Sequence, residues 1–442
     1  MSATDTHTSR ASHAVLALLV GGYASIFLGR QIMAVMIEPI KLEFGASDTA
    51  MGLISGLAFA VAYALMGLPA GGLADRHSRV RLLALCGVIW AITTVICGFA
   101  VSFPMLVIAR MLVAVTEAPV TPASLSLIAD LYPARNRSLA ISCFTAAPTL
   151  SAIVGLGLGA WVIDTWGWRT GFYLIASPPL LISLLLALAV REPERGRFDN
   201  PLHGNAPALG LWRSARQLLG NAHYRKLVAA CAWFSFSGLA FAMWNTPFLI
   251  RSHGLSLQSA GILAGVVTGC SAALGGLFSG WLSDRLNLRS QAWLLGLPLI
   301  GTLVTLLSLL LYLLWPPGIA FQIGAVEVPT AMLWCALMGF FTMWWVAPCF
   351  NLLTQMVSPR QRATAVALQT ICTTLAGIGL GPLLTGALSD LLLPWAGDES
   401  LRYALLGVHL TLLIPAWLLL QLYRQQAFAP EQALHGVPMS TS

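Results

Sequence analysis

Hydrophobic residues along the chain form twelve long runs separated by shorter polar segments. Each run contains about 20 to 27 residues, the length of a helix that crosses a lipid bilayer. Because a backbone in lipid has to satisfy its polar groups within its own segment, runs of this length predict helices. The runs begin near Ala14, Thr49, Leu82, Pro104, Ser138, Thr170, Leu227, Ser259, Ala292, Pro329, Ala363 and Leu401. The pattern predicts an all-α integral membrane protein with twelve transmembrane helices.

Two motifs occur once in each half of the chain. GGLADRHSRVR at 71–81 follows the second run, and GWLSDRLNLR at 280–289 follows the eighth. PARNRSLA begins at Pro133 before the fifth run, and PRQRATA begins at Pro359 before the eleventh. Repetition of this kind in a twelve-helix chain predicts two pseudo-symmetric six-helix bundles, with a binding site between them near the membrane midplane.

A long polar segment separates the two halves. It is basic, contains proline and glycine, and includes an amphipathic stretch around 211–219 that is typical of a helix lying on a membrane surface. We therefore expect an N-terminal bundle at 1–190, a cytoplasmic linker at 191–224, a C-terminal bundle at 225–424 and a cytoplasmic tail at 425–442.

The composition excludes an ordinary soluble domain. The 442 residues are 57% hydrophobic and 9% charged, with a mean hydropathy of +0.78. All eight cysteines fall in predicted helices without CxxC spacing, so we expect no disulfide, no metal site and no cofactor. The net charge of +7 does not indicate nucleic-acid binding, because the basic residues are distributed by membrane side.

That distribution predicts the orientation. Of the 24 Lys and Arg residues, 18 fall in segments on the N-terminal side of the membrane and only four fall in the opposite loops. The four are Lys41, Arg169, Arg251 and Arg402. An excess of basic residues marks the cytoplasmic side, so we expect both termini in the cytoplasm.

The remaining two cations, Arg30 and Arg110, lie inside predicted helices together with one acidic residue, Glu117. Arg110 and Glu117 are seven positions apart, which places them on one helical face about 10 Å apart along the axis. Thr121 continues that face. Charges at this depth usually face a bundle interior or a wet cavity, so we interpret all four residues as substrate-binding. A structural polar pair, or an Arg30 that reaches the outer interface, is the alternative.

Aromatic residues accompany polar groups and prolines in two helices of the second half. FAMWNTPFLIRSHG contains Trp244 and Asn245, and FFTMWWVAPCFN contains Trp344 and Trp345. We expect these four residues to line an amphipathic substrate cavity; packing or contact with lipid is the alternative role.

The repeated loops after the second and eighth helices predict a conformational latch on the cytoplasmic side. Each loop places an aspartate at a helix end beside arginines, where a charge network can hold neighbouring helices together. The predicted latch residues are Asp75, Arg76, Arg79, Asp284 and Arg285.

Taken together, the GxLxDR loop after the second helix, its echo after the eighth, and the R-x(6)-E spacing of Arg110 and Glu117 resemble the major facilitator superfamily. More narrowly, several segments are similar to bacterial spinster-like transporters, relatives of lysolipid and sphingolipid exporters. These segments are GRQIMAVMIEPIK, SDTAMGLISGLAFAVAYALMGLPAGGLADR, ARMLVAVTEAP, SLIADLYPARNRS, NTPFLIRSHGLS and GLGPLLTGALSD. The resemblance covers nearly the whole chain and implies the major facilitator fold, alternating access and a bacterial inner membrane.

One departure from the family pattern concerns proton coupling. The family places an aspartate directly before the arginine of the first helix and ties it to coupling, whereas this chain has Gly29. It also has Ala114 and Thr116 where the family tends to have glycines. Glu117 is therefore the remaining candidate for a proton carrier.

Arg30, Arg110 and Glu117 together give a net charge of about plus one, which favours an anionic head group gripped by paired arginine donors. We expect an alternating-access transporter of an anionic amphipathic substrate resembling a lysophospholipid, with proton coupling through Glu117. The alternatives are a small organic-anion carrier, a proton-independent facilitator and, more remotely, a lipid scramblase or membrane enzyme. The chain has no GxSxG motif and no phosphate-binding loop, so we expect no enzymatic activity. The expected partners are membrane lipids, the substrate and protons, with no nucleic acid, and we expect a monomer.

Overall fold

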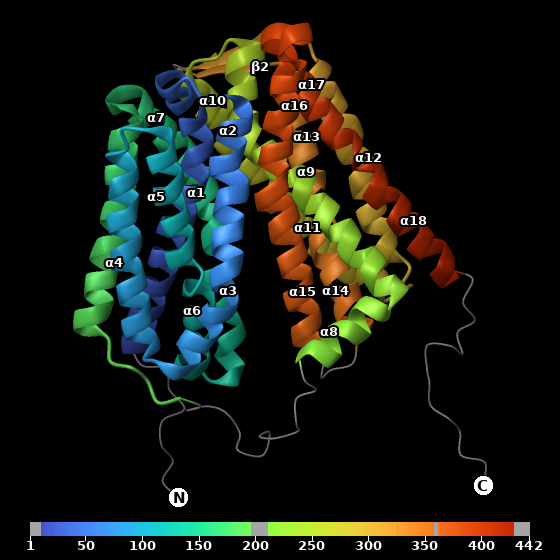
Figure 1. Ribbon diagram of the computed structural model, residues 1–442. Helices are drawn as coiled ribbons and strands as arrows, with labels where there is room; N and C mark the ends of the chain where they lie inside the picture. The colour runs from blue at the N-terminus through green and yellow to red at the C-terminus, as the bar shows by residue number, and fades with distance from the viewer. Residues whose placement is uncertain (1–9, 196–210, 325, 358–360, 428–442) are drawn as a thin grey trace, which may run out of the picture.

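The hydrophobic runs form long helices in the computed structural model (Figure 1). The structure describes residues 10–195, 211–324, 326–357 and 361–427. Much of the predicted linker and nearly all of the predicted tail at 425–442 lie outside these residues, so the predicted region boundaries stay predictions.

The number of membrane crossings follows from two stretches that fold back on themselves. Ten helices in the described ranges are long and apolar enough to cross a membrane. One of them belongs to α7 (Ala134–Ala189), which turns back at Gly167, whose φ of 79° is a conformation that glycine adopts readily. Another, Thr364–Gln425, turns back at Gly397–Glu399. Each of these stretches crosses twice, which confirms the prediction of twelve crossings.

The first six crossings form the N-terminal bundle. A short π-helical turn, η1, interrupts the second crossing, and a break after Glu117 divides the fourth crossing. The elements are α1 (Arg10–Phe44), α2 (Asp48–Gly52), η1 (Leu53–Leu57), α3 (Ala58–Arg76), α4 (Arg79–Gly98), α5 (Phe103–Glu117), α6 (Val120–Leu131) and α7 (Ala134–Ala189).

The last six crossings form the C-terminal bundle. They follow α8 (Leu211–Gly220), the helix expected from the amphipathic stretch of the linker. The elements are α9 (Ala222–His253), α10 (Leu257–Leu263), η3 (Ala264–Thr268), α11 (Gly269–Asn287), α12 (Trp293–Leu314), α13 (Met332–Thr342), α14 (Val346–Gln355), α15 (Arg362–Thr374), η5 (Leu375–Leu380), α16 (Gly381–Ala396), η6 (Gly397–Glu399), α17 (Ser400–Leu410) and α18 (Leu413–Ala427).

Within the described residues, an antiparallel hairpin is the one addition to the predicted all-α architecture. Strand β1 (Ile319–Ile323) pairs with β2 (Val326–Pro329) between α12 and α13. We call the end of the molecule that carries this hairpin the hairpin side, and the opposite end, which carries α8, the α8 side (Figure 1).

Glycines in equivalent helices confirm the pseudo-symmetry of the bundles. A Cβ on Gly159 of α7 would lie 2.5 Å from the side chain of Ile32 on α1, the first crossing. A Cβ on Gly381 of α16 would lie 2.7 Å from the Phe236 carbonyl on α9, the seventh crossing. The fifth crossing thus packs on the first as the eleventh packs on the seventh, in both cases through glycines that permit close approach.

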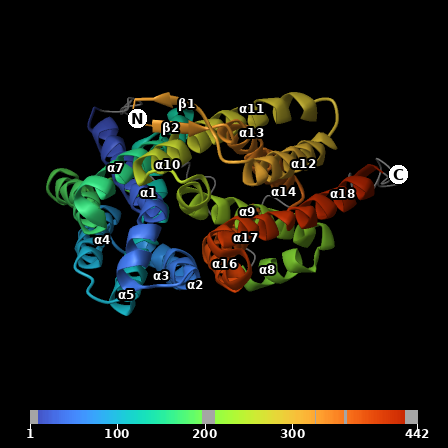
Figure 2. The same cartoon turned by 90° about the horizontal axis from the view of Figure 1, so that it is seen from above.

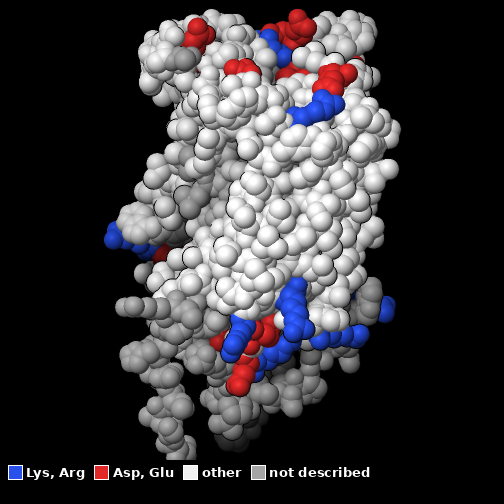
Figure 3. All heavy atoms as spheres, turned by 90° about the vertical axis from the view of Figure 1, so that its left-hand side faces the viewer, with Lys and Arg blue, Asp and Glu red and all other residues white. Residues whose placement is uncertain are grey.

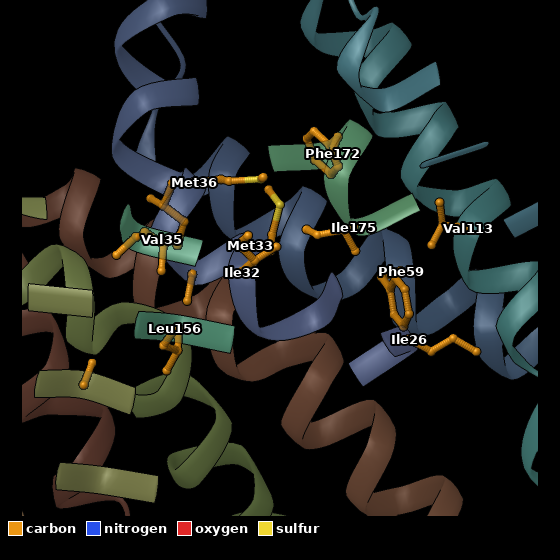
Figure 4. Packing of buried hydrophobic residues seen from close by; sticks show 14 of the residues in the cluster. Ile26, Ile32, Met33, Val35, Met36, Phe59, Val113, Leu156, Phe172 and Ile175 are labelled. Atoms are coloured by element: carbon orange, nitrogen blue, oxygen red, sulfur yellow. The ribbon is translucent and has the colours of Figure 1, made fainter. Parts of the chain in front are cut away.

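The core of the N-terminal bundle forms where α1 packs against α7. Met33 and Met36 of α1 lie close to Phe172 and Ile175 of α7 (Figure 4), and all four side chains are at most 4% exposed. This packing fixes α1 as a rigid element, which positions Arg30 one turn before Met33.

The outer surface of the molecule is apolar between two charged ends. Lys, Arg, Asp and Glu gather at both ends and leave a broad uncharged band between them on the face in Figure 3. Large side chains such as Leu65, Leu139, Leu277, Leu333 and Leu391 are exposed over the helices. A surface of this kind is unfavourable in water and suited to acyl chains. The protein is therefore an integral membrane protein.

The two bundles lie side by side and are in close contact on the hairpin side (Figures 1 and 2). A Cβ on Gly52 of α2 would lie 2.4 Å from the Pro382 carbonyl of α16, and one on Gly261 of α10 would lie 2.4 Å from the Cβ of Ala160 on α7. Toward the α8 side the bundles diverge (Figure 1).

Candidate functional site

A cavity of about 250 Å³ lies between the bundles and contains two arginines, and we call it the charged cavity. Arg30 of α1, Phe59 of α3 and Arg110 of α5 line it from the N-terminal bundle. Met243 of α9 and Pro382 of α16 line it from the C-terminal bundle. Because both bundles contribute, a ligand bound here would contact both halves of the molecule.

Arg30 and Glu117 form an ion pair at this cavity. Nη2 of Arg30 lies 2.6 Å from Oε1 of Glu117, and the side chains are 20% and 4% exposed. The arginine reaches the cavity surface while the carboxylate stays behind it. Separating the pair would leave a buried charge without compensation, which is strongly unfavourable.

The fourth crossing is broken directly after Glu117. Helix α5 ends at that residue, and the next helix, α6, begins at Val120 directly after its N-cap residue Pro119. Arg110 and Glu117 remain two turns apart on one helix, as predicted. Thr121 lies after the break, and its Oγ1 lies 3.5 Å from the Tyr23 hydroxyl instead of lining either cavity. Its role in substrate binding stays a prediction.

Aromatic rings surround the guanidinium groups. The Cζ of Arg30 lies 4.8 Å from the ring centre of Phe27, 4.9 Å from that of Phe59 and 5.2 Å from that of Tyr63. The Cζ of Arg110 lies 5.4 Å from the same Phe59 ring. Cation–π contacts of this kind stabilise a charge that has lost much of its water.

Arg110 has no carboxylate partner among the described residues. Its side chain is 4% exposed, and its Nε is buried without a hydrogen-bond partner in that part of the chain. Since Arg30 and Glu117 compensate each other, Arg110 leaves the site with a net charge of plus one. The position before Arg30 carries no acidic side chain, because it is Gly29. A Cβ at this position would point away from the cavity, toward the Trp90 ring at 3.1 Å and Ile175 at 3.4 Å.

A second cavity of about 360 Å³, mostly within the C-terminal bundle, adjoins the first, and we call it the apolar cavity. Gln31, Leu239 and Ala242 line both cavities, so the two are adjacent. Two predicted site residues, Asn245 and Trp345, line the apolar cavity. The Asn245 Oδ1 accepts a 2.7 Å hydrogen bond from the Tyr312 hydroxyl, and Trp345 stacks on Phe234 at 5.3 Å.

The other two predicted tryptophans pack inside the protein. Trp244 is fully buried, and its Nε1 donates to the Pro382 carbonyl at 3.0 Å, which ties α9 to α16. Trp344 is 6% exposed and packs against Gly301 and Phe341. Neither lines a cavity in this conformation, because both point into contacts between helices.

The predicted latch residues lie on the α8 side. Arg79 is buried and binds Asp130 of α6 and Glu192 after α7, so it joins elements of the N-terminal bundle. Arg76, Asp284 and Arg285 are exposed, and the side chain of Asp75 lies outside the described residues. A latch between bundles stays a prediction for a conformation in which the α8 side is closed.

Charged residues on the hairpin side join the bundles, and the sequence reasoning missed this arrangement. Arg251 of α9 binds both oxygens of Asp48 on α2, at 2.7 and 2.9 Å, and lies 2.6 Å from Glu38 of α1. Lys41 also pairs with Asp48, at 2.6 Å. The signal was present, since Lys41 and Arg251 are two of only four cations assigned to this side.

A carboxylate of the C-terminal bundle caps a helix of the N-terminal bundle. Asp390 of α16 accepts hydrogen bonds from the backbone N–H groups of Asp48 at 2.9 Å and Thr49 at 2.7 Å, in the first turn of α2. An acidic side chain at a helix N-terminus satisfies free donors and interacts favourably with the helix dipole. Together with Glu38, Lys41, Asp48 and Arg251, Asp390 forms what we call the hairpin-side network.

Comparison with known proteins identifies the family. Residues 19–316, more than half of the chain, match the Major Facilitator Superfamily. The chain belongs to the Major Facilitator Superfamily. It is therefore a secondary transporter and not an enzyme.

The superfamily members that it resembles differ in what their names say they transport. An MFS-type efflux pump of Mycolicibacterium smegmatis is 30% identical, covering 95% of each chain. The sphingosine-1-phosphate transporter SPNS2 of Danio rerio is 25% identical over 87% of this chain and 78% of that one. The probable galactarate/D-glucarate transporter GudP of Escherichia coli is 25% identical over 58% and 63%.

Solved structures confirm the fold and the spinster-like resemblance. A bacterial homologue of the human lysosomal transporter spinster, in an inward-facing and unoccupied conformation, has a TM-score of 0.84 and 27% identity. It covers 95% of this chain, which covers 98% of it. The same homologue in an inward-facing and occupied conformation has a TM-score of 0.80.

Proposed function

We propose that this transporter carries an anionic amphipathic substrate, with its acidic head group in the charged cavity and its apolar part in the apolar cavity. The adjacency of the two cavities carries this proposal. One end holds the uncompensated Arg110, and the adjoining, larger space is lined mainly by apolar side chains such as Phe241 and Met338. Their summed volume is in the range typical of sites for drug-sized ligands.

A small organic anion is the second candidate. The similarity to galactarate/glucarate transporters favours it, since a sugar diacid is anionic and lacks an apolar part. Such a substrate would bind at Arg110 but leave the apolar cavity without a function. The lysolipid-like class uses both cavities, and for this reason we prefer it.

The substrate site faces the cytoplasm in this conformation. The bundles are closed against each other on the hairpin side and diverge on the α8 side, which the distribution of basic residues assigns to the cytoplasm. The inward-facing conformations of the similar spinster homologue support the same orientation. We place the protein in the bacterial inner membrane with both termini in the cytoplasm.

Arg110 provides the direct test. Arg110→Gln removes the charge and keeps part of the side-chain volume, and it should weaken binding of 1-oleoyl lysophosphatidate about 10- to 100-fold, the worth of a charge-assisted hydrogen bond. Binding is measured on the purified protein in detergent. Arg424→Gln, at an exposed arginine of α18, is the matched control. Tight binding of glucarate but not of the lysolipid would instead establish the small-anion candidate.

Glu117 is the proposed proton carrier. An anion that engages Arg30 competes with Glu117 for the same guanidinium, and protonation then neutralises the carboxylate left behind. Glu117→Gln should abolish stimulation of lysolipid transport by a pH gradient in proteoliposomes while counterflow exchange continues. Glu194→Gln, at an exposed glutamate, should keep the stimulation. Stimulation that persists in Glu117→Gln would show that the proton moves elsewhere or not at all.

A further inference from the structure

The β1–β2 hairpin has one apolar and one polar face. Residues opposite each other in an antiparallel pair point to the same face, and successive residues of a strand alternate between the two faces. Two pairs of apolar partners therefore share one face, which we call the apolar face: Phe321 with Val328, and Ile323 with Val326. The polar partners Gln322 and Glu327 lie on the opposite face.

The protein covers only the β2 half of the apolar face. Strand β2 packs on α10, and Val328 is buried in the cluster that also contains Leu263 of that helix. On β1, in contrast, Phe321 is 55% exposed and Ile323 is 66% exposed. Figure 2 shows β1 at the outer margin of the molecule, with β2 between it and α10. The apolar face is therefore directed toward the bundle, and β1 carries it past the edge of the bundle.

The lipid-facing surface reaches the base of the hairpin. Leu314, the last residue of α12, and Leu333, in the first turn of α13, are both exposed. Next to them in the chain, Trp315 and Trp334 lie with their ring centres 5.5 Å apart. Tryptophans concentrate where a bilayer meets water, so the hairpin begins at the level of the membrane surface.

The size and charge of the hairpin favour lipid over protein as its partner. Nine strand residues are too few for a stable protein interface, which takes about 20 to 30 residues from each side. Residues 315–331 include no Lys or Arg, and Glu327 is their one charged residue, on the face turned away from the bundle. Attraction to an anionic surface is therefore excluded as the basis of binding, and the apolar side chains remain.

We propose that the apolar face of the hairpin binds the membrane leaflet on the hairpin side. Phe321 and Ile323 insert among the acyl chains close to the head groups, and Gln322 and Glu327 face water, as in other amphipathic elements that lie in the interface. The contact anchors the connection between α12 and α13, and with it the C-terminal bundle, to the lipid surface. It goes beyond the proposed function, because it holds for any substrate.

Spin labels at neighbouring positions of β1 provide the test. Phe321→Cys and Gln322→Cys are labelled separately in a protein that carries serine at the three cysteines that are not buried, Cys143, Cys270 and Cys372. Power-saturation EPR in phosphatidylcholine nanodiscs compares collisions with oxygen, which concentrates in the bilayer, and with Ni(II)-EDDA, which stays in water. The label at 321 should collide several-fold less with Ni(II)-EDDA than the label at 322, and more with oxygen.

Three further labels make the result interpretable. Ile323→Cys, with Phe321 in place, should repeat the result at 321. Leu333→Cys gives the value for the lipid-facing surface, and Asp398→Cys, at an exposed residue of η6, gives the value for water. Equal collision rates at 321 and 322 would overturn the proposal, because an amphipathic element has to distinguish its faces. Shielding of the label at 321 from both reagents would overturn it as well, since it would show that a protein, such as a second copy of this chain, covers the face.

Lipid composition separates insertion from electrostatic attraction. Since residues 315–331 carry no cation, the labels at 321 and 322 should give the same values in nanodiscs with and without phosphatidylglycerol. Insertion that appears only with phosphatidylglycerol would show that cations elsewhere in the protein draw the hairpin to the surface, and it would refute the apolar basis of the contact.

Discussion

Buried arginines have two distinct roles in this chain, and their partners show which is which. Arg79 is 1% exposed and binds Asp130 and Glu192, so its charge is compensated within the N-terminal bundle. Arg110 is similarly buried but has no carboxylate partner in the described residues. Removing a partner from a compensated buried arginine destabilises the fold, whereas an uncompensated arginine beside a cavity is available to an anionic ligand.

The ion pair between Arg79 and Glu192 makes the stability of the fold depend on pH. Partial burial raises its pKa, but hydrogen bonds from the Val80 N–H, Arg79 and the Ser78 hydroxyl outweigh burial, and the pKa is lowered overall. A lowered pKa in the folded state means that the stabilisation is complete above the unfolded-state pKa, roughly 4.3, and is lost as the pH falls through the folded-state value.

We therefore expect Glu192→Gln to lower the apparent melting temperature by about 2 °C at pH 7, a small effect because the side chain is partly exposed. Below about pH 4 the difference from wild type should shrink as the wild-type carboxylate becomes protonated. Differential scanning fluorimetry across this pH range measures both. A difference that stays constant with pH would contradict the assignment.

For single residues, the sequence predicts which charged side chains lie in the site better than it predicts which hydroxyl groups do. Arg30, Arg110 and Glu117 stand out because charged residues inside hydrophobic runs are rare, and the structure brings all three to one site. The Tyr312 hydroxyl that binds Asn245 does not stand out, since nothing in the sequence shows which hydroxyl reaches that amide.

At the scale of single elements, helix irregularities lie where the bundles meet. The π-helical turns η1 and η5 pack against each other, and Gly56 of η1 would bring a Cβ within 2.9 Å of the Gly379 carbonyl of η5. Contacts this close between backbones allow the bundles to seal on the hairpin side. They also leave no room for a larger residue.

A single methyl group should disturb that seal. A Cβ on Gly52 would lie 2.4 Å from the Pro382 carbonyl, so Gly52→Ala should push α2 away from α16 and favour opening of the hairpin side. Spin labels at the exposed positions Leu42 and Trp395 should then move apart in double electron–electron resonance. Gly67→Ala in α3, where a Cβ meets nothing within 4 Å, should leave the distance unchanged. Identical distances in both variants would disprove steric control by Gly52.

The lengths of the membrane crossings can be predicted from the sequence, whereas the interruptions within their helices cannot. A run of apolar residues predicts a crossing, but π-helical turns and the break after Glu117 depend on tertiary contacts and on the two prolines Pro119 and Pro122. The hairpin β1–β2 was also missed. It has only nine strand residues around a tight turn at Gly324, next to a hydrophobic run long enough to dominate the local pattern.

For the whole molecule, the hairpin-side network joins the two bundles on the face that is closed, and we expect it to act as the lock. All four cations assigned to this side are paired: Lys41 and Arg251 with Asp48, Arg169 with Glu43, and Arg402 with Glu399. Only Arg251 joins one bundle to the other. The other three pairs lie within a bundle and should survive rocking.

That difference supplies a matched pair of variants. Arg251→Gln breaks the link to Asp48 and Glu38 and should shift the population toward a conformation open on the hairpin side. Arg169→Gln breaks the Glu43 pair within the N-terminal bundle and should not. A cysteine introduced at Ser55, which lines the charged cavity, should react several-fold faster with an impermeant thiol reagent added from the hairpin side in the first variant only. Equal rates would exclude the network as the lock.

The two-bundle architecture is predictable because repeats and run lengths are local properties of the sequence. The conformation is not, because it depends on pairings such as Arg251 with Asp48, which are 203 positions apart, and Asp390 with Asp48, 342 apart. The sequence groups Arg251 with Lys41 on one side of the membrane but does not indicate which carboxylates bind them.

The cap that Asp390 provides to α2 has a consequence for how the transporter opens. In the first turn of the second crossing, two backbone N–H groups donate hydrogen bonds to Asp390 in the opposite half of the protein. Separating the halves therefore also exposes those N–H groups to water. Opening is therefore coupled to fraying of one helix end. The amides of Asp48 and Thr49 should therefore lose their protection from solvent exchange whenever the hairpin side opens.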